Sequence, residues 1–256
     1  LVMTDYRTLS RGLNEYAAVK SRFLSGGFNY KNPVKGLFTH VMVMRSWDDS
    51  DKQYGRDFSD KYIIGYYTHH PTTSNNWTIM GTVTSNLDFL HGMAGINVMY
   101  INSEQSMISE NDRTSFRTGS LHTTGRINGR IGEILNWQYR VSYGWNRLDA
   151  DEQVNRKLEQ WCHSFAMTVV PVTRVNVQLA GEYYRNEVSE NIFKDIVLLD
   201  AKCSYTLTPH TELSATLMNV FNRKKYSYTI YGQLSSVEHY RRIRGREFLL
   251  NLYVKL

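Results

Sequence analysis

A strict alternation of apolar and polar side chains is the clearest pattern in this sequence. From Leu135 to Asn146, twelve residues alternate without an error. The odd positions hold apolar or aromatic side chains: Leu135, Trp137, Tyr139, Val141, Tyr143 and Trp145. A helix would spread both kinds of side chain over every face, whereas an extended strand places them on opposite faces. The segment therefore predicts a β-strand with one apolar and one polar face.

The same period-two pattern recurs around 77–84, 175–184, 199–207 and 248–256. Several of these predicted strands run past ten residues, whereas strands of soluble sheets usually have about five or six. A strand that crosses a membrane needs ~9–11 residues. Strand length therefore favours an all-β protein built from antiparallel transmembrane β-barrel strands.

The polar faces of these strands carry charges, including Arg140, Glu182, Asp200 and Lys202. Such a face would be the outside of a soluble β-sandwich or the wet interior of a membrane barrel, and alternation alone does not separate the two. No apolar stretch approaches the ~18 residues of a transmembrane helix. The longest purely apolar runs are short, such as Val41–Met44.

Turn signals divide the chain into strand pairs. Compact turns are predicted near Pro33, at Asp88 to Gly92, near Asn128–Gly129, at Pro171 and at Pro209. The later four are about 39, 42 and 38 residues apart, and polar linkers lie between them at Ser103 to Arg113, Asp149 to Lys157 and Asn186 to Glu190. Short turns on one side and longer loops on the other are typical of outer-membrane barrels. We expect ten to twelve strands, all antiparallel, and no helix. In the least clear region, 48–76, Tyr62 to Tyr67 is either a strand or part of a large outer loop.

Composition agrees with this reading. The 256 residues have a low mean hydropathy of −0.45 but include 18 Tyr, 10 Phe and 5 Trp. The net charge of +6 comes from scattered Lys and Arg mixed with acids, which argues against a nucleic-acid partner. Cys162 is predicted on a polar strand face and Cys203 on an apolar one. One whole strand separates them, so we expect no disulfide.

No catalytic signature stands out, and we expect that the protein is not an enzyme. There is no nucleophile elbow, P-loop, dinucleotide fingerprint or zinc-protease motif. His69–His70 precedes Pro71 in a polar region, which fits a surface loop better than a metal site. Glu182 and Asp200 are expected to face each other across neighbouring strands, but wet barrel interiors commonly carry such charges. We assign no catalytic, cofactor-binding or metal residues and expect no cofactor. The substrate-binding residues stay unknown.

Aromatic residues cluster where strands are predicted to end. Tyr226, Tyr228, Tyr231 and Tyr240 follow the strand that starts at Glu212, and Trp145 and Trp161 flank the linker from Asp149. Such rings favour membrane–water interfaces and form girdles at barrel rims. An aromatic-rich loop of a soluble sandwich is the alternative. The basic run from Tyr240 to Arg246 suits a barrel wall that enters the polar interior.

The C-terminal fifty residues resemble a known family. Leu217-Met-Asn-Val-Phe-Asn-Arg-Lys-Lys-Tyr226 resembles the xxNLFNxxY motif of TonB-dependent outer-membrane receptors. The segments from Tyr226 and Tyr240 resemble the closing pattern of such receptors in Bacteroidota. The final alternation, Phe248 to Leu256, resembles the C-terminal insertion signal, although its last residue is Leu256 instead of an aromatic.

The resemblance implies a 22-stranded barrel, of which residues 1–256 would be the C-terminal portion without the plug domain. Since Leu1 is not a start residue, we expect the chain to begin within a longer protein. The implied function is outer-membrane import of a nutrient such as a siderophore, glycan or peptide. The implied partners are outer-membrane lipid, the TonB complex through the missing plug, the barrel assembly machinery and, as one option, a surface lipoprotein. The alternatives are a complete small outer-membrane barrel acting as a passive pore or structural protein, and a soluble carbohydrate-binding β-sandwich.

Overall fold

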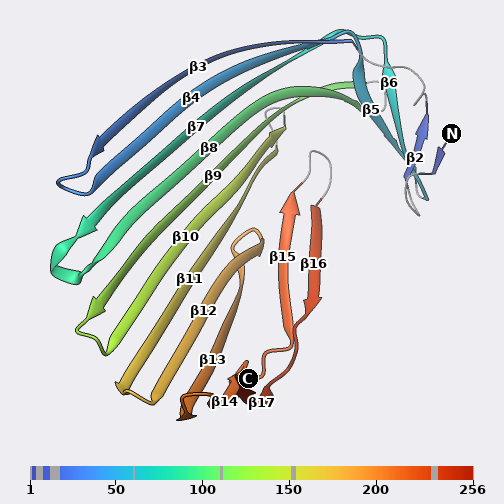
Figure 1. The fold of residues 1–256 in the computed structure, drawn as a ribbon. Helices are drawn as coiled ribbons and strands as arrows, with labels where there is room; N and C mark the ends of the chain where they lie inside the picture. Colours follow the sequence, from blue (N-terminus) through green and yellow to red (C-terminus); the bar gives the residue numbers. More distant parts are fainter. Residues whose placement is uncertain are drawn as a thin grey trace.

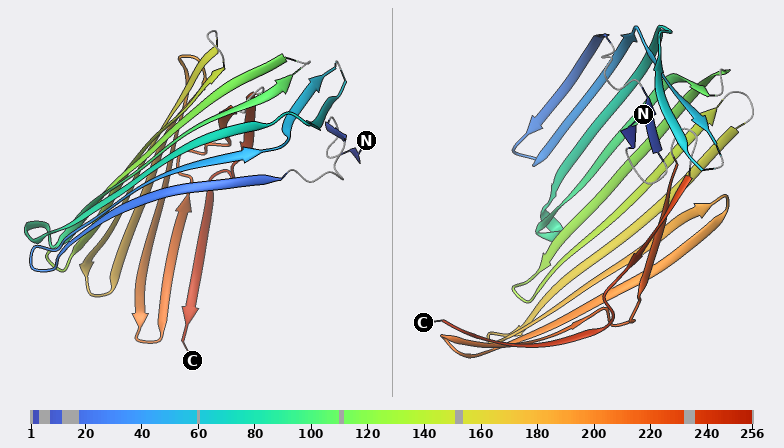
Figure 2. Two further views of the ribbon diagram at one scale, coloured as in Figure 1. Left: turned by 90° about the horizontal axis from the view of Figure 1, so that it is seen from above. Right: turned by 90° about the vertical axis from the view of Figure 1, so that its right-hand side faces the viewer.

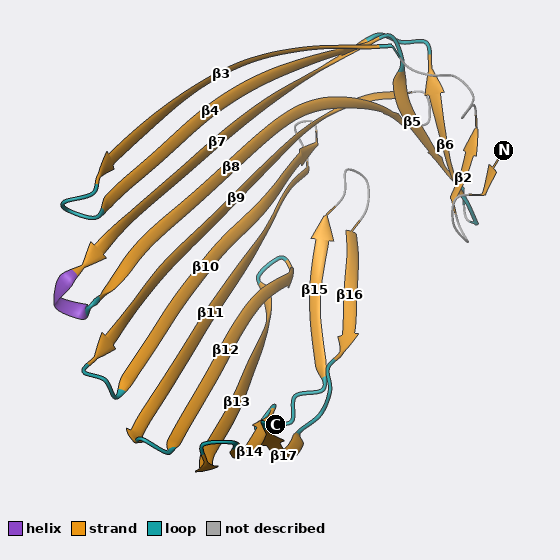
Figure 3. Cartoon of the chain, viewed as in Figure 1, coloured by secondary structure: helices purple, strands orange, loops and turns teal. Residues whose placement is uncertain are grey.

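A long curved β-sheet makes up most of the chain (Figure 1). The computed structural model describes residues 2–3, 8–11, 18–59, 61–109, 112–150, 154–231 and 236–255. Figure 3 shows that strands dominate this part of the chain, with one short 3-10 helix, η1 (Asp88–Leu90). Within the same residues, no helix is long and apolar enough to cross a membrane.

Eleven of the described strands form a continuous antiparallel wall. In spatial order they are β3 (Val19–Asn32), β4 (Leu37–Ser50), β7 (Thr72–Leu87), β8 (Gly92–Ser109), β9 (Asp112–Ile131), β10 (Leu135–Ala150), β11 (Val154–Val172), β12 (Val175–Ser189), β13 (Ile192–Thr208), β14 (Thr211–Met218) and β17 (Glu247–Val254). The fold class is therefore confirmed as all-β. The sequence predicted ten to twelve strands for the chain, whereas the described residues contain seventeen, of which eleven form the wall.

Shorter strands lie outside this wall: β1 (Val2–Met3), β2 (Thr8–Arg11), β5 (Gln53–Phe58), β6 (Ile63–Thr68), β15 (Lys225–Tyr231) and β16 (Ser236–Arg242). Two of their pairings, β2 with β6 and β5 with β8, are parallel. The expectation of a purely antiparallel, helix-free chain is thus wrong in detail. Tyr62–Tyr67 falls largely in β6, which forms a hairpin with β5.

Register shows which residues share a face. Arg140, Ser164 and Glu182 stand in line on β10, β11 and β12. One residue along, Val141, His163 and Tyr183 form the neighbouring row on the opposite face. The β15–β16 hairpin lies on the concave side of the wall (Figures 1 and 2) and touches residues of the Arg140 face. We call that concave side the inner face and the other the outer face.

Two predicted turns were displaced. Asn128 and Gly129 lie inside β9, and the turn falls at 132–134, where Gly132 has a φ of +57°. A Cβ on Gly129 would meet the Trp137 ring at 3.1 Å, so this glycine serves close packing. Pro171 lies inside β11, where the register shifts between Val169 and Val172; a residue without an N–H is tolerated at such an irregularity. The predicted turns near Pro33, at Asp88 to Gly92 and at Pro209 are confirmed.

The three polar linkers are mostly strand. The β8–β9 ladder continues to the pair Ser109 and Asp112, and β12 continues to Ser189. Between Asp149 and Lys157, Asp149–Ala150 belongs to β10 and Val154–Lys157 to β11. Backbone pairing continues after the apolar alternation stops, so polarity alone misplaced these strand ends.

The inner face is not uniformly polar. At the end of the wall near β5, Met107, Phe116 and Leu148 form a buried apolar cluster, with Tyr54 packed against it. Phe116 is 2% exposed. Burial of apolar side chains therefore holds the β5–β6 hairpin against the inner face.

The described sheet is open. β3 pairs with β4 alone, and β17 pairs with β14 alone. A C-terminal portion of a larger barrel is expected to leave one edge near Tyr16, which lies outside the described residues, and another near Leu252, which lies on β17. An unpaired strand edge exposes backbone donors and acceptors, which is costly in a bilayer.

Candidate functional site

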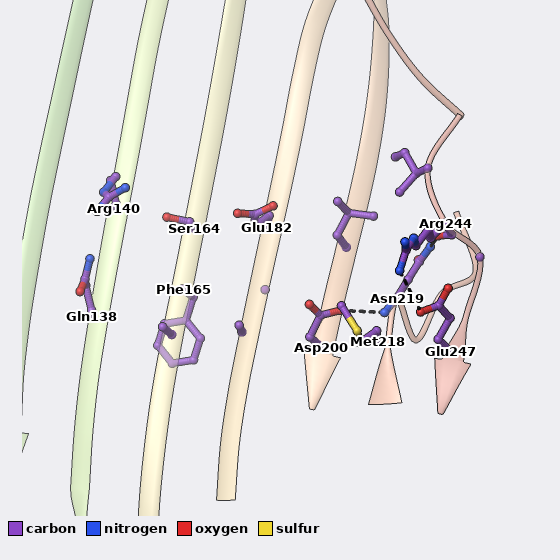
Figure 4. Close-up of a pocket in the computed structure, with 16 residues that line it drawn as sticks. Gln138, Arg140, Ser164, Phe165, Glu182, Asp200, Met218, Asn219, Arg244 and Glu247 are labelled. Atoms are coloured by element: carbon purple, nitrogen blue, oxygen red, sulfur yellow. Dashed lines mark hydrogen bonds and ion pairs between the residues drawn. The ribbon is translucent and has the colours of Figure 1, made fainter. Parts of the chain in front are cut away.

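A hollow of about 380 Å³ lies on the inner face where the chain leaves the wall (Figure 4). The wall contributes Gln138 and Arg140 from β10, Ser164 from β11, Glu182 from β12 and Asp200 from β13. The opposite side consists of the two segments that lead into and out of the β15–β16 hairpin, including Asn219 and Arg244. Alternation delivers the polar wall residues to this side, because they occupy the even positions of their strands.

Asn219 fixes the bend after β14. It is buried and has a φ of +49°, a left-handed conformation that Asn tolerates better than most residues. Its backbone N–H donates to Asp200 Oδ1 at 2.7 Å, and its Nδ2 donates to the carbonyl oxygens of Arg223 and Arg244, both at 2.7 Å. Its Oδ1 accepts the Arg223 N–H at 2.9 Å. One side chain therefore joins the outgoing and returning segments.

Asn222, three residues later, closes the same bend. Its φ is +53°, and its Oδ1 accepts the Arg246 N–H at 3.0 Å. These are the two asparagines of the motif from Leu217 to Tyr226. The sequence identified the segment as a motif, but only the tertiary structure shows which groups its asparagines bind.

The β15–β16 hairpin is tethered to the inner face. Asn186 Nδ2 donates to the Ser227 carbonyl oxygen at 3.2 Å, and Thr229 Oγ1 donates to the Val188 carbonyl oxygen at 2.9 Å. Asn186 and Thr229 are both buried. The Tyr226 ring packs edge-on against Tyr184 at a centroid separation of 5.5 Å.

This position corrects two sequence-based predictions. Tyr226, Tyr228 and Tyr240 belong to the hairpin on the concave side and not to a girdle on the outer face. The basic run is not part of the wall either. It ends β16 and then forms the loop that lines the hollow. The chain leaves the wall after Met218, and alternation did not reveal this break.

The outer face carries a belt of aromatic rings. Tyr143 lies 4.4 Å from Trp161, centroid to centroid, and Trp161 stacks on His163 at 6.1 Å. Tyr139 Oη is 2.7 Å from His163 Nδ1. On β10 the outer side chains run from Leu135 to Trp145 before the charged residues Arg147 and Asp149 begin. This succession from apolar through aromatic to charged matches the exterior of a membrane barrel.

The belt extends to the other end of the wall. The guanidinium carbon of Arg45 lies 4.6 Å from the Trp47 ring centroid and 4.9 Å from that of Trp77. By register and alternation, all five tryptophans fall on the outer face: Trp47, Trp77, Trp137, Trp145 and Trp161. Trp145 thus lies on the apolar face that was predicted for it, and Trp161 lies on the same face.

The carboxylates singled out from the sequence do not form a pair. Asp200 stands opposite Ala180, and Glu182 stands opposite Leu198, so the two acids are diagonal neighbours. Glu182 accepts a hydrogen bond from the Tyr184 hydroxyl, and Asp200 accepts one from the Asn219 backbone N–H. Among the described residues, no group of three or more metal-ligating side chains converges, and His69 and His70 are exposed. Cys162 and Cys203 are free, as predicted.

Comparison with known proteins supports the fold. No protein-family model matches the chain, and neither does any curated protein sequence. Among solved structures, it resembles a variant of the ferric enterobactin receptor of Pseudomonas aeruginosa. The TM-score is 0.51, the sequence identity is 11%, and the match covers 87% of this chain and 38% of that one. The chain thus spans well under half of the receptor it matches, and its large sheet of long antiparallel strands matches part of a TonB-dependent receptor barrel.

Proposed function

We propose that this chain forms part of the wall of a TonB-dependent transporter in the outer membrane. The observation that carries the proposal is the two-faced curved sheet, with aromatic and apolar side chains outside and polar side chains inside. This arrangement fits a wall between lipid and a polar lumen. The resemblance to a receptor barrel supports the same reading.

The open sheet calls for further strands in the same protein. Two unpaired edges would leave backbone groups without partners in lipid. We propose that residues 1–256 are the C-terminal portion of a larger barrel of about 22 strands, a size that the family resemblance implies. A plug domain elsewhere in the protein would receive energy from the TonB complex.

The imported nutrient would be a siderophore, a glycan or a peptide. A surface lipoprotein would be an additional partner if the receptor is of the Bacteroidota type, which its closing sequence pattern favours. Insertion of the protein into the outer membrane would use the barrel assembly machinery, which would recognise the alternating final strand. No observation favours the complete small pore over this reading.

Cell fractionation with an uptake assay tests the proposal. The whole protein should sediment with outer membranes and resist carbonate extraction. Growth on its nutrient should stop when either the protein or TonB is deleted. Recovery as a soluble monomer would refute the membrane assignment. Uptake that persists without TonB would favour the passive pore.

A further inference from the structure

Two arginines stand directly opposite each other on the inner face. Arg126 of β9 and Arg140 of β10 are cross-strand partners. Directly opposite residues have Cβ atoms about 4.5–5.5 Å apart, and like charges in such a pair destabilise a sheet. Among the described residues, no carboxylate forms an ion pair with either guanidinium. The pair is therefore an unneutralised double positive charge on the proposed lumen wall.

The surroundings provide further polar contacts. The row on one side of the arginines holds Thr124 and Ser142, whose hydroxyl oxygens are 3.0 Å apart. The row on the other side holds the amides of Asn128 and Gln138. These groups frame the arginines with side chains that donate hydrogen bonds to oxygen.

The Arg126 side chain lies over a glycine. Its cross-strand partner on β8 is Gly95, where an added Cβ would come within 3.3 Å of Arg126 Nε. A hollow of about 510 Å³ opens over this part of the wall and is lined by both arginines, Thr124, Ser142 and Asn97. The first acid along the arginine row is Glu182, two strands beyond Arg140 and about 10 Å away at ordinary strand spacing. It accepts the Tyr184 hydroxyl.

We propose that Arg126 and Arg140 bind an anionic solute that carries carboxylate or phosphate groups. Each guanidinium presents a planar fork of donors that matches two oxygens of such a group. A bound anion would also relieve the repulsion between the two positive charges. The inference rests on the proposed function and narrows the imported nutrient to an anion.

Direct binding to the whole protein in detergent tests the site. Calorimetric titrations would use citrate for carboxylates, inorganic phosphate for phosphates, and maltose as a neutral solute. The wild type should bind at least one of the two anions and not maltose. Arg126→Gln and Arg140→Gln should each weaken binding roughly tenfold or more, because each removes a charged hydrogen-bond donor. Arg126→Lys should recover part of the loss, since it keeps the charge without the fork.

The matched control is Arg130→Gln. Arg130 lies on the same strand and face as Arg126, four residues nearer the turn at 132–134, and its Nε donates to the Gly132 carbonyl oxygen at 2.7 Å. This variant should bind as the wild type does. An equal loss of anion affinity in Arg130→Gln would show that the anion responds to the general positive potential of the wall and not to a specific site, and would overturn the proposal. A wild type that binds neither anion, for instance because an acidic segment of the same protein covers the arginines, also overturns it. Outer-membrane location and TonB-dependent growth are scored separately, so the proposed function survives or fails independently.

Discussion

Lys194 Nζ donates to Glu238 Oε1 at 2.6 Å and joins the wall strand β13 to the inner hairpin. The side chains are 43% and 33% exposed, so screening by water keeps this ion pair weak. It nevertheless connects the hairpin to the wall at a point distant from the bend at Asn219. The pair is a pH-dependent contact beside the buried tethers of Asn186 and Thr229.

The first prediction concerns that pH dependence. The hydrogen bond from Lys194 lowers the pKa of Glu238 below its ordinary value of 4.5. A carboxyl with a lowered pKa in the folded state stabilises the fold fully above its ordinary pKa, and the effect disappears as pH falls through the lowered pKa. Protection factors of the β15–β16 amides, which correct exchange rates for the intrinsic effect of pH, should therefore stay constant from neutral pH down to that ordinary value and then fall. In Glu238→Gln, this acid-induced fall should be absent. An identical acid response in both proteins would show that the pair does not hold the hairpin.

The second prediction concerns the bend at Asn219. Asn219→Gly keeps the left-handed backbone accessible but loses three side-chain hydrogen bonds, which should cost about 2–3 kcal/mol of unfolding free energy. Asn219→Ala should cost about 1 kcal/mol more, because a Cβ is disfavoured at positive φ. Urea unfolding of the membrane-inserted protein measures both. Asn222→Gly, which loses one such bond, should be the mildest. A milder effect for Asn219→Ala than for Asn219→Gly would contradict this account.

The third prediction tests the two faces of the last strand. Leu252 is 63% exposed on the outer face, and Asn251 stands opposite Ser214 on the inner face. Arg at the lipid midplane costs ~2–4 kcal/mol in barrels. Leu252→Arg should therefore reduce the yield of heat-modifiable folded protein much more than Asn251→Arg. Equal yields would refute the assigned register.

The fourth prediction concerns the aromatic belt. In a protein that keeps Trp161 as its sole tryptophan, nitroxide lipids labelled near the headgroup should quench the tryptophan fluorescence. The reason is that the ring lies next to Tyr143 on the outer face. A second protein, with Tyr184→Trp as its sole tryptophan on the inner face, serves as the control and should not be quenched. Quenching of the control alone would reverse the assignment of inside and outside.

The fifth prediction concerns residues 1–256 expressed alone. Because β3 and β17 are each paired on one side only, the sheet must either close at a different curvature or leave edges in lipid. We expect aggregation, no heat-modifiable species and no channel in planar bilayers. A stable monomer with its own conductance would support the small passive pore instead.

What the sequence predicted well is local. Alternation placed Val141 and Arg140 on opposite faces, because side-chain direction in a strand depends only on residue parity. The sequence-based prediction failed where one residue type is compatible with two different structures. Gly129 looks like a turn residue but makes room for Trp137, and polar residues near Asp112 look like a loop but continue a ladder.

The candidate sites depended on relationships that no local pattern contains. Arg126 and Arg140 are fourteen positions apart, and they meet because the hairpin turns at 132–134 instead of at Asn128–Gly129. A shift of register by one residue would turn one of them to the outer face. Asn219 likewise acts through carbonyl groups of Arg223 and Arg244, which approach only once β15–β16 folds back over the wall. The sequence by itself determined the strands and their two faces, because these follow from each residue's own chemistry and parity. Only the tertiary structure decided which inner residues meet, because register and curvature are set by long-range pairing along the whole wall.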